Sequence, residues 1–171
     1  MSRSIKRPVV EKKRNKNQQI NQKIQKRNIK RLNADGIIKK IKENDCFAGI
    51  VEDKKLQYMN ILKSPITIVI LIVDHWIAVH ISNKHLIVFD SLCRLFEENY
   101  MNIRRFIKKH MINRQLIITP VLQNATDNSC GYFVTYFVKE VCYKPFTDLM
   151  KPFTADSNHN VDYVLDYYSE I

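Results

Sequence analysis

Apolar residues in this chain fall into short runs, and the spacing within each run predicts a strand or a helix. The clearest run covers residues 66–73, which are continuously apolar, rich in β-branched side chains and preceded by Pro65, as in a buried strand. Three further runs have the length and composition of strands, and the last of them is interrupted or ended by Pro120. The predicted strands are residues 66–73, 76–82, 85–89 and 116–122.

Helical periodicity occurs on both sides of these strands. A short apolar stripe follows Asn33 and Asp35, either of which is in position to cap its first turn, and a loop with Gly49 is expected after it. A longer stripe alternates with Arg and Lys, as on a surface helix, whereas the run from Cys130 is apolar nearly all round, as in a buried helix. The predicted helices are a short one carrying Ile37, Ile38 and Ile41, and residues 95–111, 130–143 and 160–169.

Charge separates an N-terminal segment from the rest of the 171-residue chain, whose length suits one domain. Residues 1–44 hold 15 of the 28 Lys and Arg residues but 3 of the 17 Asp and Glu residues, so the remainder is nearly neutral. We therefore expect a basic, disordered arm over residues 1–33 and a folded domain over residues 34–171. Such an arm suits a polyanion, although an AT-rich coding bias would also enrich Lys, Asn and Ile. The side chains expected to contact nucleic acid are Arg3, Lys6, Arg7, Lys12, Lys13, Arg14, Lys16, Lys23, Lys26, Arg27, Lys30 and Arg31.

The four cysteines argue against a zinc site, because none of them has a partner at the spacing of zinc ligands. The N-terminus lacks the apolar segment of a secretory signal, and the longest apolar run is too short to span a bilayer. These features predict a soluble protein of a reducing compartment, with free thiols, no metal and no membrane contact.

Cys130 is the candidate nucleophile. It follows a polar loop and begins the predicted buried helix, where the positive end of the helix dipole favours a thiolate. Gly131 would let the backbone approach a substrate closely. Cys142, in the same helix, is expected to be an ordinary core residue. The local sequence therefore favours a thiol reaction at Cys130.

His75 and Asp90 are the candidate base and its acidic partner. His75 follows one predicted strand, and Trp76, which begins the next, would shape the site and exclude water. An imidazole there would deprotonate Cys130. Asp90 ends the following strand, so adjacent pairing would bring it to His75, where it would orient the ring. The alternatives for the acid are Asp74 and Asp127.

Gln123 stands seven residues before Cys130 and is the candidate oxyanion donor, together with the backbone N–H of Cys130. With these residues in the order His75-Trp76, Phe89-Asp90-Ser91, Gln123 and Cys130-Gly131, the chain resembles the clan of cysteine proteases that includes adenovirus maturation protease and the SUMO-specific proteases. The resemblance covers about residues 35–150. Two departures are Ser129, where the SUMO branch commonly has Asp, and Asp90, where adenovirus-type enzymes often have Glu.

The resemblance implies an α+β fold of the papain-like or adenain-like type, in which a central mixed sheet packs against the helix that carries Cys130. It implies a thiol endopeptidase with His75 as base, Asp90 as its partner, Cys130 as nucleophile and Gln123 as oxyanion donor. The small size favours the viral branch, from a virophage, a virus-like DNA transposon or a related DNA virus. A monomer of that branch would cleave capsid and core precursors after Gly-containing motifs, in the virion and at the host-cell site of virus assembly, in the nucleus or a cytoplasmic factory. No cofactor is required by the sequence, and DNA is a candidate activating cofactor bound by the basic arm.

Two other functions compete with capsid maturation. An isopeptidase that removes ubiquitin-like modifiers would use the same four residues and a similar preference for Gly-Gly. A non-catalytic DNA-binding packaging protein would retain the fold alone, with the basic arm carrying its function.

Overall fold

The structure is a computed structural model that describes residues 29–171. The basic residues from Arg3 to Arg27, and the predictions of disorder and nucleic-acid binding made for them, lie outside the described residues. The described elements are α2 (Ala34–Ile41), β1 (Phe47–Glu52), η1 (Asp53–Tyr58), β2 (Ile66–Ile72), β3 (His75–Ile81), β4 (His85–Phe89), η2 (Glu98–Tyr100), α3 (Met101–His110), β5 (Gln115–Ile118), α4 (Cys130–Glu140), α5 (Phe146–Met150) and α6 (Ser157–Glu170).

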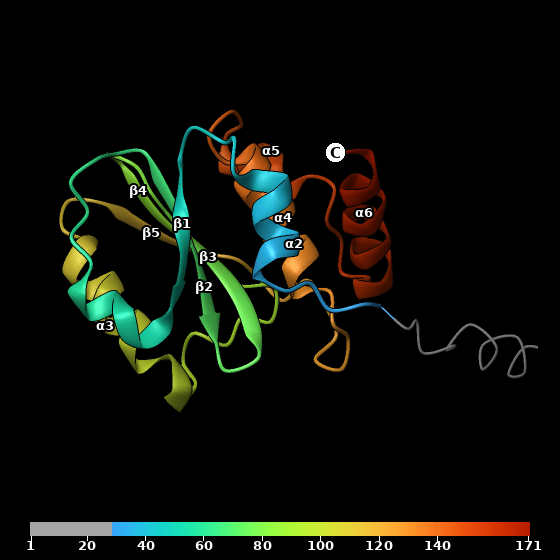
Figure 1. Cartoon of the computed structure of the whole chain (residues 1–171), viewed down its shortest axis with the longest axis horizontal. Helices are drawn as coiled ribbons and strands as arrows, with labels where there is room; N and C mark the ends of the chain where they lie inside the picture. The colour runs from blue at the N-terminus through green and yellow to red at the C-terminus, as the bar shows by residue number, and fades with distance from the viewer. Residues whose placement is uncertain (1–28) are drawn as a thin grey trace, which may run out of the picture.

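A five-stranded mixed sheet in the order β1-β2-β3-β4-β5 organises the domain. The central strands β2, β3 and β4 pair antiparallel, whereas β1 and β5 add parallel strands at the two edges. Helices α2, α4 and α6 cover one face, and α3 covers the other (Figure 1). The fold is therefore the predicted α+β arrangement, a mixed sheet packed against the helix that begins with Cys130.

Both faces of the central strands are buried, which explains why they read as continuous apolar runs. Val69, Ala78 and Phe89 lie in the core layer shared with α4, and Phe89 stacks on Phe137 with ring centroids 4.4 Å apart. The alternate residues, such as Ile70 and Val79, lie in the layer shared with α3. This double packing fixes the strands that bear the site.

Three sequence predictions differ from the structure. The loop expected around Gly49 contains edge strand β1, whose bulge between Phe47 and Gly49 disrupts the alternation that marks a strand. The helix expected from residue 95 begins at Met101, and Phe96, placed on its apolar stripe, is 79% exposed. The strand expected over 116–122 ends at Ile118, two residues before Pro120.

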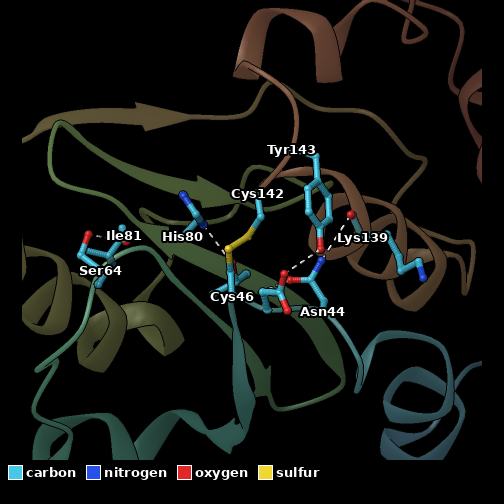
Figure 2. Close-up of a disulfide and its surroundings, with 10 residues drawn as sticks. Asn44, Cys46, Ser64, His80, Ile81, Lys139, Cys142 and Tyr143 are labelled. Atoms are coloured by element: carbon cyan, nitrogen blue, oxygen red, sulfur yellow. Dashed lines mark hydrogen bonds between the residues drawn. A yellow bond between two sulfur atoms is a disulfide. The ribbon is translucent and has the colours of Figure 1, made fainter.

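Cys46 and Cys142 form a disulfide between the segment before β1 and the segment after α4, contrary to the expectation of free thiols (Figure 2). Ninety-six positions separate them in sequence, so the chain alone gave no reason to pair them. His80 of β3 lies beside this bond, on the sheet face that packs on α4 (Figure 2). Cys93 and Cys130 are the free cysteines of the described residues.

Candidate active site

The four predicted catalytic side chains lie together at one end of the strands. β3 begins at His75, and its antiparallel partner β4 ends at Phe89, which places Asp90 at the same end of the sheet. β5 runs parallel to β4, so the segment that follows β5 brings Gln123 to this end as well. Cys130, at the first position of α4, completes the cluster.

The imidazole of His75 donates a hydrogen bond from Nε2 to Oδ1 of Asp90 over 2.8 Å. Burial alone would lower the pKa of His75, but the hydrogen bonds and charges of Asp90 and Cys130 outweigh it and raise the pKa to about 9. Because Nε2 is held by Asp90, Nδ1 is the nitrogen that remains for the thiol. The ring is therefore oriented for proton exchange with Cys130.

Asp90 is fully buried and held at both carboxylate oxygens. Oδ1 accepts from the backbone N–H of Leu92 as well as from His75, and Oδ2 accepts from the backbone N–H of Arg94. Thr119, which sequence reasoning missed, bonds the Asp90 backbone through its hydroxyl, which accepts from the N–H and donates to the carbonyl. The carboxylate is consequently fixed before any substrate binds.

Cys130 carries a thiol whose pKa is lowered. Burial acts in the opposite direction, but the hydrogen bond and charge of His75, a backbone hydrogen bond from Trp76 and the charge of Arg31 favour the thiolate. Ser129 provides no side-chain cap at the start of α4, and the backbone hydrogen bonds of the first turn begin with the N–H of Tyr132, so those of Cys130 and Gly131 precede them. The site can thus hold a thiolate–imidazolium pair next to unused backbone donors.

Gln123 is almost fully buried, and its side chain is anchored by Ser91. The Ser91 hydroxyl donates to Oε1 of Gln123 over 2.7 Å, and the Ser91 carbonyl accepts from the backbone N–H of Gln123. With its oxygen held in this way, the amide presents its N–H group to the cleft that Gln123 lines. Ser91 follows Asp90 directly in the sequence, but no sequence pattern indicated that its hydroxyl would bond the side chain of Gln123.

A Ser91→Ala variant is expected to lower kcat about 10- to 100-fold with little change in KM, because a rotated amide loses part of the stabilisation that one oxyanion donor gives. Steady-state kinetics on a peptide or modifier substrate measure this split. Thr67→Val is the matched control, since it removes a buried hydroxyl that bonds His80 at the other end of the sheet. An equal effect of both variants would mean that Ser91 acts through stability alone.

Residues 29–33, which we call the strap, lie on the domain although the sequence placed them in the arm. The Trp76 indole donates to the carbonyl of Leu32, and the Tyr132 hydroxyl donates to the carbonyl of Lys30. Arg31 forms an ion pair with Asp74 and lines the cleft. Two residues predicted to contact nucleic acid, Lys30 and Arg31, therefore lie beside the candidate site.

The strap changes the interpretation of Gly131 and Trp76. A Cβ atom at position 131 would stand 2.8 Å from the Cβ of Leu32, so the missing side chain makes room for the strap. Trp76 is buried in the core and holds Leu32 from the strand side. Both residues thus support the site by fixing the strap, a contact that the sequence pattern gave no signal for.

Two truncations distinguish the role of the strap in catalysis from that of the basic arm. Removal of residues 2–28 is expected to leave hydrolysis of a short peptide within about 2-fold, whereas removal of residues 2–33 is expected to lower kcat/KM about 100-fold, since displacing a catalytic group by 1 Å costs that much. Kinetics of the two proteins, with circular dichroism to check folding, test this difference. Equal activities would show that the strap does not support the site.

A cleft of about 250 Å³ opens over the cluster and is lined by Cys130, His75, Gln123 and the Arg31–Asp74 pair. A shallower hollow of about 520 Å³ shares Gln123, Leu92 and Arg94 with it and exposes Phe96 and Val121. The two hollows adjoin at these shared residues, and we call them together the trough, one end of which lies at the Cys130 thiol. Exposed apolar side chains next to a cleft are typical of a protein-binding surface.

The alternatives for the acid have other contacts. Asp74 pairs with Arg31 and is largely exposed, whereas Asp127 accepts hydrogen bonds from the backbone of Asn124 and from Ser129 and thereby shapes the loop before Cys130. Within residues 29–171, no three His, Cys, Asp or Glu side chains are grouped as metal ligands. No helix in that range is long and apolar enough to cross a membrane.

Comparison with known protein families gives an extensive match. The family model described as ElaD/SseL-like C-terminal matches residues 11–168, nearly the whole chain. A solved structure described as the crystal structure of the de-sumoylating protease aligns over 90% of this chain and 68% of its own, at 17% identity and a TM-score of 0.40, which is too weak to carry a conclusion. No curated protein matches the sequence.

Proposed function

Because the chain belongs to the ElaD/SseL-like C-terminal family, which comprises deubiquitinase-like cysteine proteases, we propose that it is a thiol isopeptidase that removes a ubiquitin-like modifier. The observation that carries the chemistry is the buried cluster in which His75 joins Asp90 at 2.8 Å and lowers the pKa of the Cys130 thiol. Family membership supports the substrate class.

In the first step, the Cys130 thiolate attacks the carbonyl carbon of the scissile amide and forms a tetrahedral oxyanion. The imidazolium of His75 then gives its proton to the departing amine nitrogen, and the C–N bond breaks to leave a thioester on Cys130. Asp90 keeps the ring in register and stabilises its charge during both proton transfers. The amine product carries the target protein.

In the second step, His75, now neutral, takes a proton from a water molecule, which attacks the thioester carbonyl. The second oxyanion collapses with loss of the sulfur, and the modifier leaves with a free carboxylate. The amide N–H of Gln123 and the backbone N–H of Cys130 are the proposed donors to both oxyanions. His75 regains from the water the proton that it gave to the amine, and the product acid gives its own proton to solvent as it becomes a carboxylate, so Cys130 and His75 return to the starting thiolate–imidazolium pair.

The family supports removal of a modifier better than capsid maturation. Viral origin, capsid precursors and binding of DNA find no support in the comparisons. The trough past Cys130 is consistent with either kind of polypeptide, so the preference for removal of a modifier rests on the family relationship.

A panel of modifier conjugates tests the proposal. The purified full chain would be incubated with ubiquitin and SUMO joined to a reporter through the C-terminal Gly-Gly, and with peptides from viral capsid precursors. We expect cleavage after Gly-Gly in at least one modifier and none in the capsid peptides. Cleavage of capsid peptides alone would overturn the proposal, and parallel reactions with duplex DNA at low and high salt test the basic arm as a DNA-dependent activator.

A further inference from the structure

Exposed apolar side chains gather at the end of the sheet that lies away from the catalytic cluster. They stand on two segments, one from the end of η1 to β2 and one between α3 and β5, and they are Tyr58, Leu62, Met111 and Ile112. Leu62 is 92% exposed and Ile112 is 69% exposed, so both project from the surface. Single apolar side chains on a surface are ordinary, whereas a group of them marks an interaction site.

Hydrogen bonds hold these two segments side by side. Two of them lead to the last residue of β3 and to the residue after it, namely Ser64 Oγ to the carbonyl of Ile81 (Figure 2) and Arg114 Nε to the carbonyl of Ser82. A third joins the segments directly, since the ammonium group of Lys109 donates to the carbonyl of Met59. Leu62 and Ile112 each stand two residues before one of the β3 anchors, so they belong to one patch.

The surroundings of these apolar side chains are basic. Residues 54–64, 82–85 and 103–115, which form this end of the domain, hold nine Lys and Arg residues and no Asp or Glu. We call the four apolar residues, together with the exposed cations Lys63, Lys84, Arg105, Lys108 and Lys109, the distal patch. The acids nearest in sequence have other partners, because Asp53 accepts from Asn102 at the start of α3 and Asp45 accepts from Tyr143 beyond the end of α4.

We propose that the distal patch docks the domain on a membrane that contains anionic lipids. Lys and Arg side chains attract the phosphate and carboxylate groups of such lipids, and projecting apolar side chains insert among the head groups. Nucleic acid would use the cations but would leave Leu62 and Ile112 against phosphate or water. An acidic protein would need hollows to receive both side chains. The combination of cations with projecting aliphatic groups therefore favours a lipid surface.

Docking at the distal patch leaves the catalytic cluster open. His75 begins β3 and Ile81 ends it beside the patch, and six residue steps of about 3.3 Å put roughly 20 Å between the two ends. The trough opens at the His75 end, so a substrate can reach Cys130 while the patch is occupied. The sequence prediction of no membrane contact rested on spanning segments alone, and projecting loop residues give no such signal.

A tryptophan placed in the distal patch reports insertion in the full-length protein, because Trp76, the single tryptophan of the chain, is buried. The emission of Leu62→Trp is expected to shift to shorter wavelength on vesicles of phosphatidylserine and phosphatidylcholine, and to stay unchanged on phosphatidylcholine alone. Phe96→Trp is the matched control, since Phe96 is 79% exposed at the catalytic end, and we expect no shift from it.

Paired charge variants of the full chain measure the contribution of the cations. Lys63→Gln with Lys108→Gln is expected to weaken co-sedimentation with the anionic vesicles about 10-fold. Lys39→Gln with Lys42→Gln removes the same charge from α2, on the other face of the sheet, and should keep binding within about 2-fold. No vesicle binding by the original chain, equal loss in both pairs, or binding without a shift in Leu62→Trp would overturn the inference. A loss confined to duplex DNA or poly-glutamate would overturn it as well.

Discussion

A Cys130→Ala variant is expected to lose kcat by a factor on the order of 10⁶, which is the scale seen when the nucleophile of a hydrolytic triad is removed. The structure explains why no other group could replace it. Cys130 is the cysteine at the start of α4, in contact with His75, and the remaining free cysteine of the described residues is Cys93. Removal of its thiol leaves the imidazole and the oxyanion donors without an attacking atom.

The effect on the fold should be small, because alanine is a good first residue of a helix and the sulfur makes no bond that holds the domain together. Thermal unfolding of the variant provides that check, and Cys93→Ala provides the matched control, with activity expected within about 2-fold of the original chain. Residual turnover by Cys130→Ala above one part in a thousand would contradict the assignment of the nucleophile.

An Asp90→Asn variant is expected to lower kcat about 10³- to 10⁴-fold and to move the alkaline limit of activity to lower pH. The active ion pair requires a deprotonated Cys130 and a protonated His75, so activity falls as pH rises through the pKa of His75 at about 9. Asp90 supplies a hydrogen bond and a negative charge that raise the pKa of His75. Asparagine lacks the charge, and its NH₂ group must face one of the backbone donors that now bond the carboxylate.

A pH profile of kcat/KM from pH 5 to 10 measures both parts of this expectation. Asp148→Asn is the matched control, because Asp148 lies in α5 and pairs with Lys151 on the surface. An alkaline limb that stays near pH 9 in Asp90→Asn would show that another group sets the protonation of His75.

The central strands and the proximity of His75 to Asp90 could be predicted from the sequence, because both follow from how strands are buried and paired. Strands buried on both faces read as unbroken apolar runs, and antiparallel pairing of β3 and β4 brings the start of one to the end of the other. His75 and Asp90 occupy those two ends, so their proximity followed from the order of the strands. The polar loop before α4 likewise identified where Cys130 would lie.

The supporting contacts were not accessible, because they join segments far apart in sequence. Leu32 packs on Gly131 and accepts from Trp76 across gaps that no periodicity encodes, and the same holds for the disulfide of Cys46 and Cys142. Edge strand β1 is bulged at Gly49 and therefore lacks the alternation of a half-buried strand. In this chain, local pattern predicted the elements and the candidate catalytic groups, whereas the contacts that hold them in place required the structure.

Mapping the residue that a modifier probe captures tests the central claim most directly. The full chain would be incubated near pH 7 with ubiquitin or SUMO bearing a vinyl methyl ester at the C-terminus, and the adduct located by peptide mass spectrometry. The account predicts a single adduct, on Cys130, that is absent from Cys130→Ala and slow to form in Asp90→Asn. An adduct on Cys93, or equal labelling of the original chain and Asp90→Asn, would contradict it.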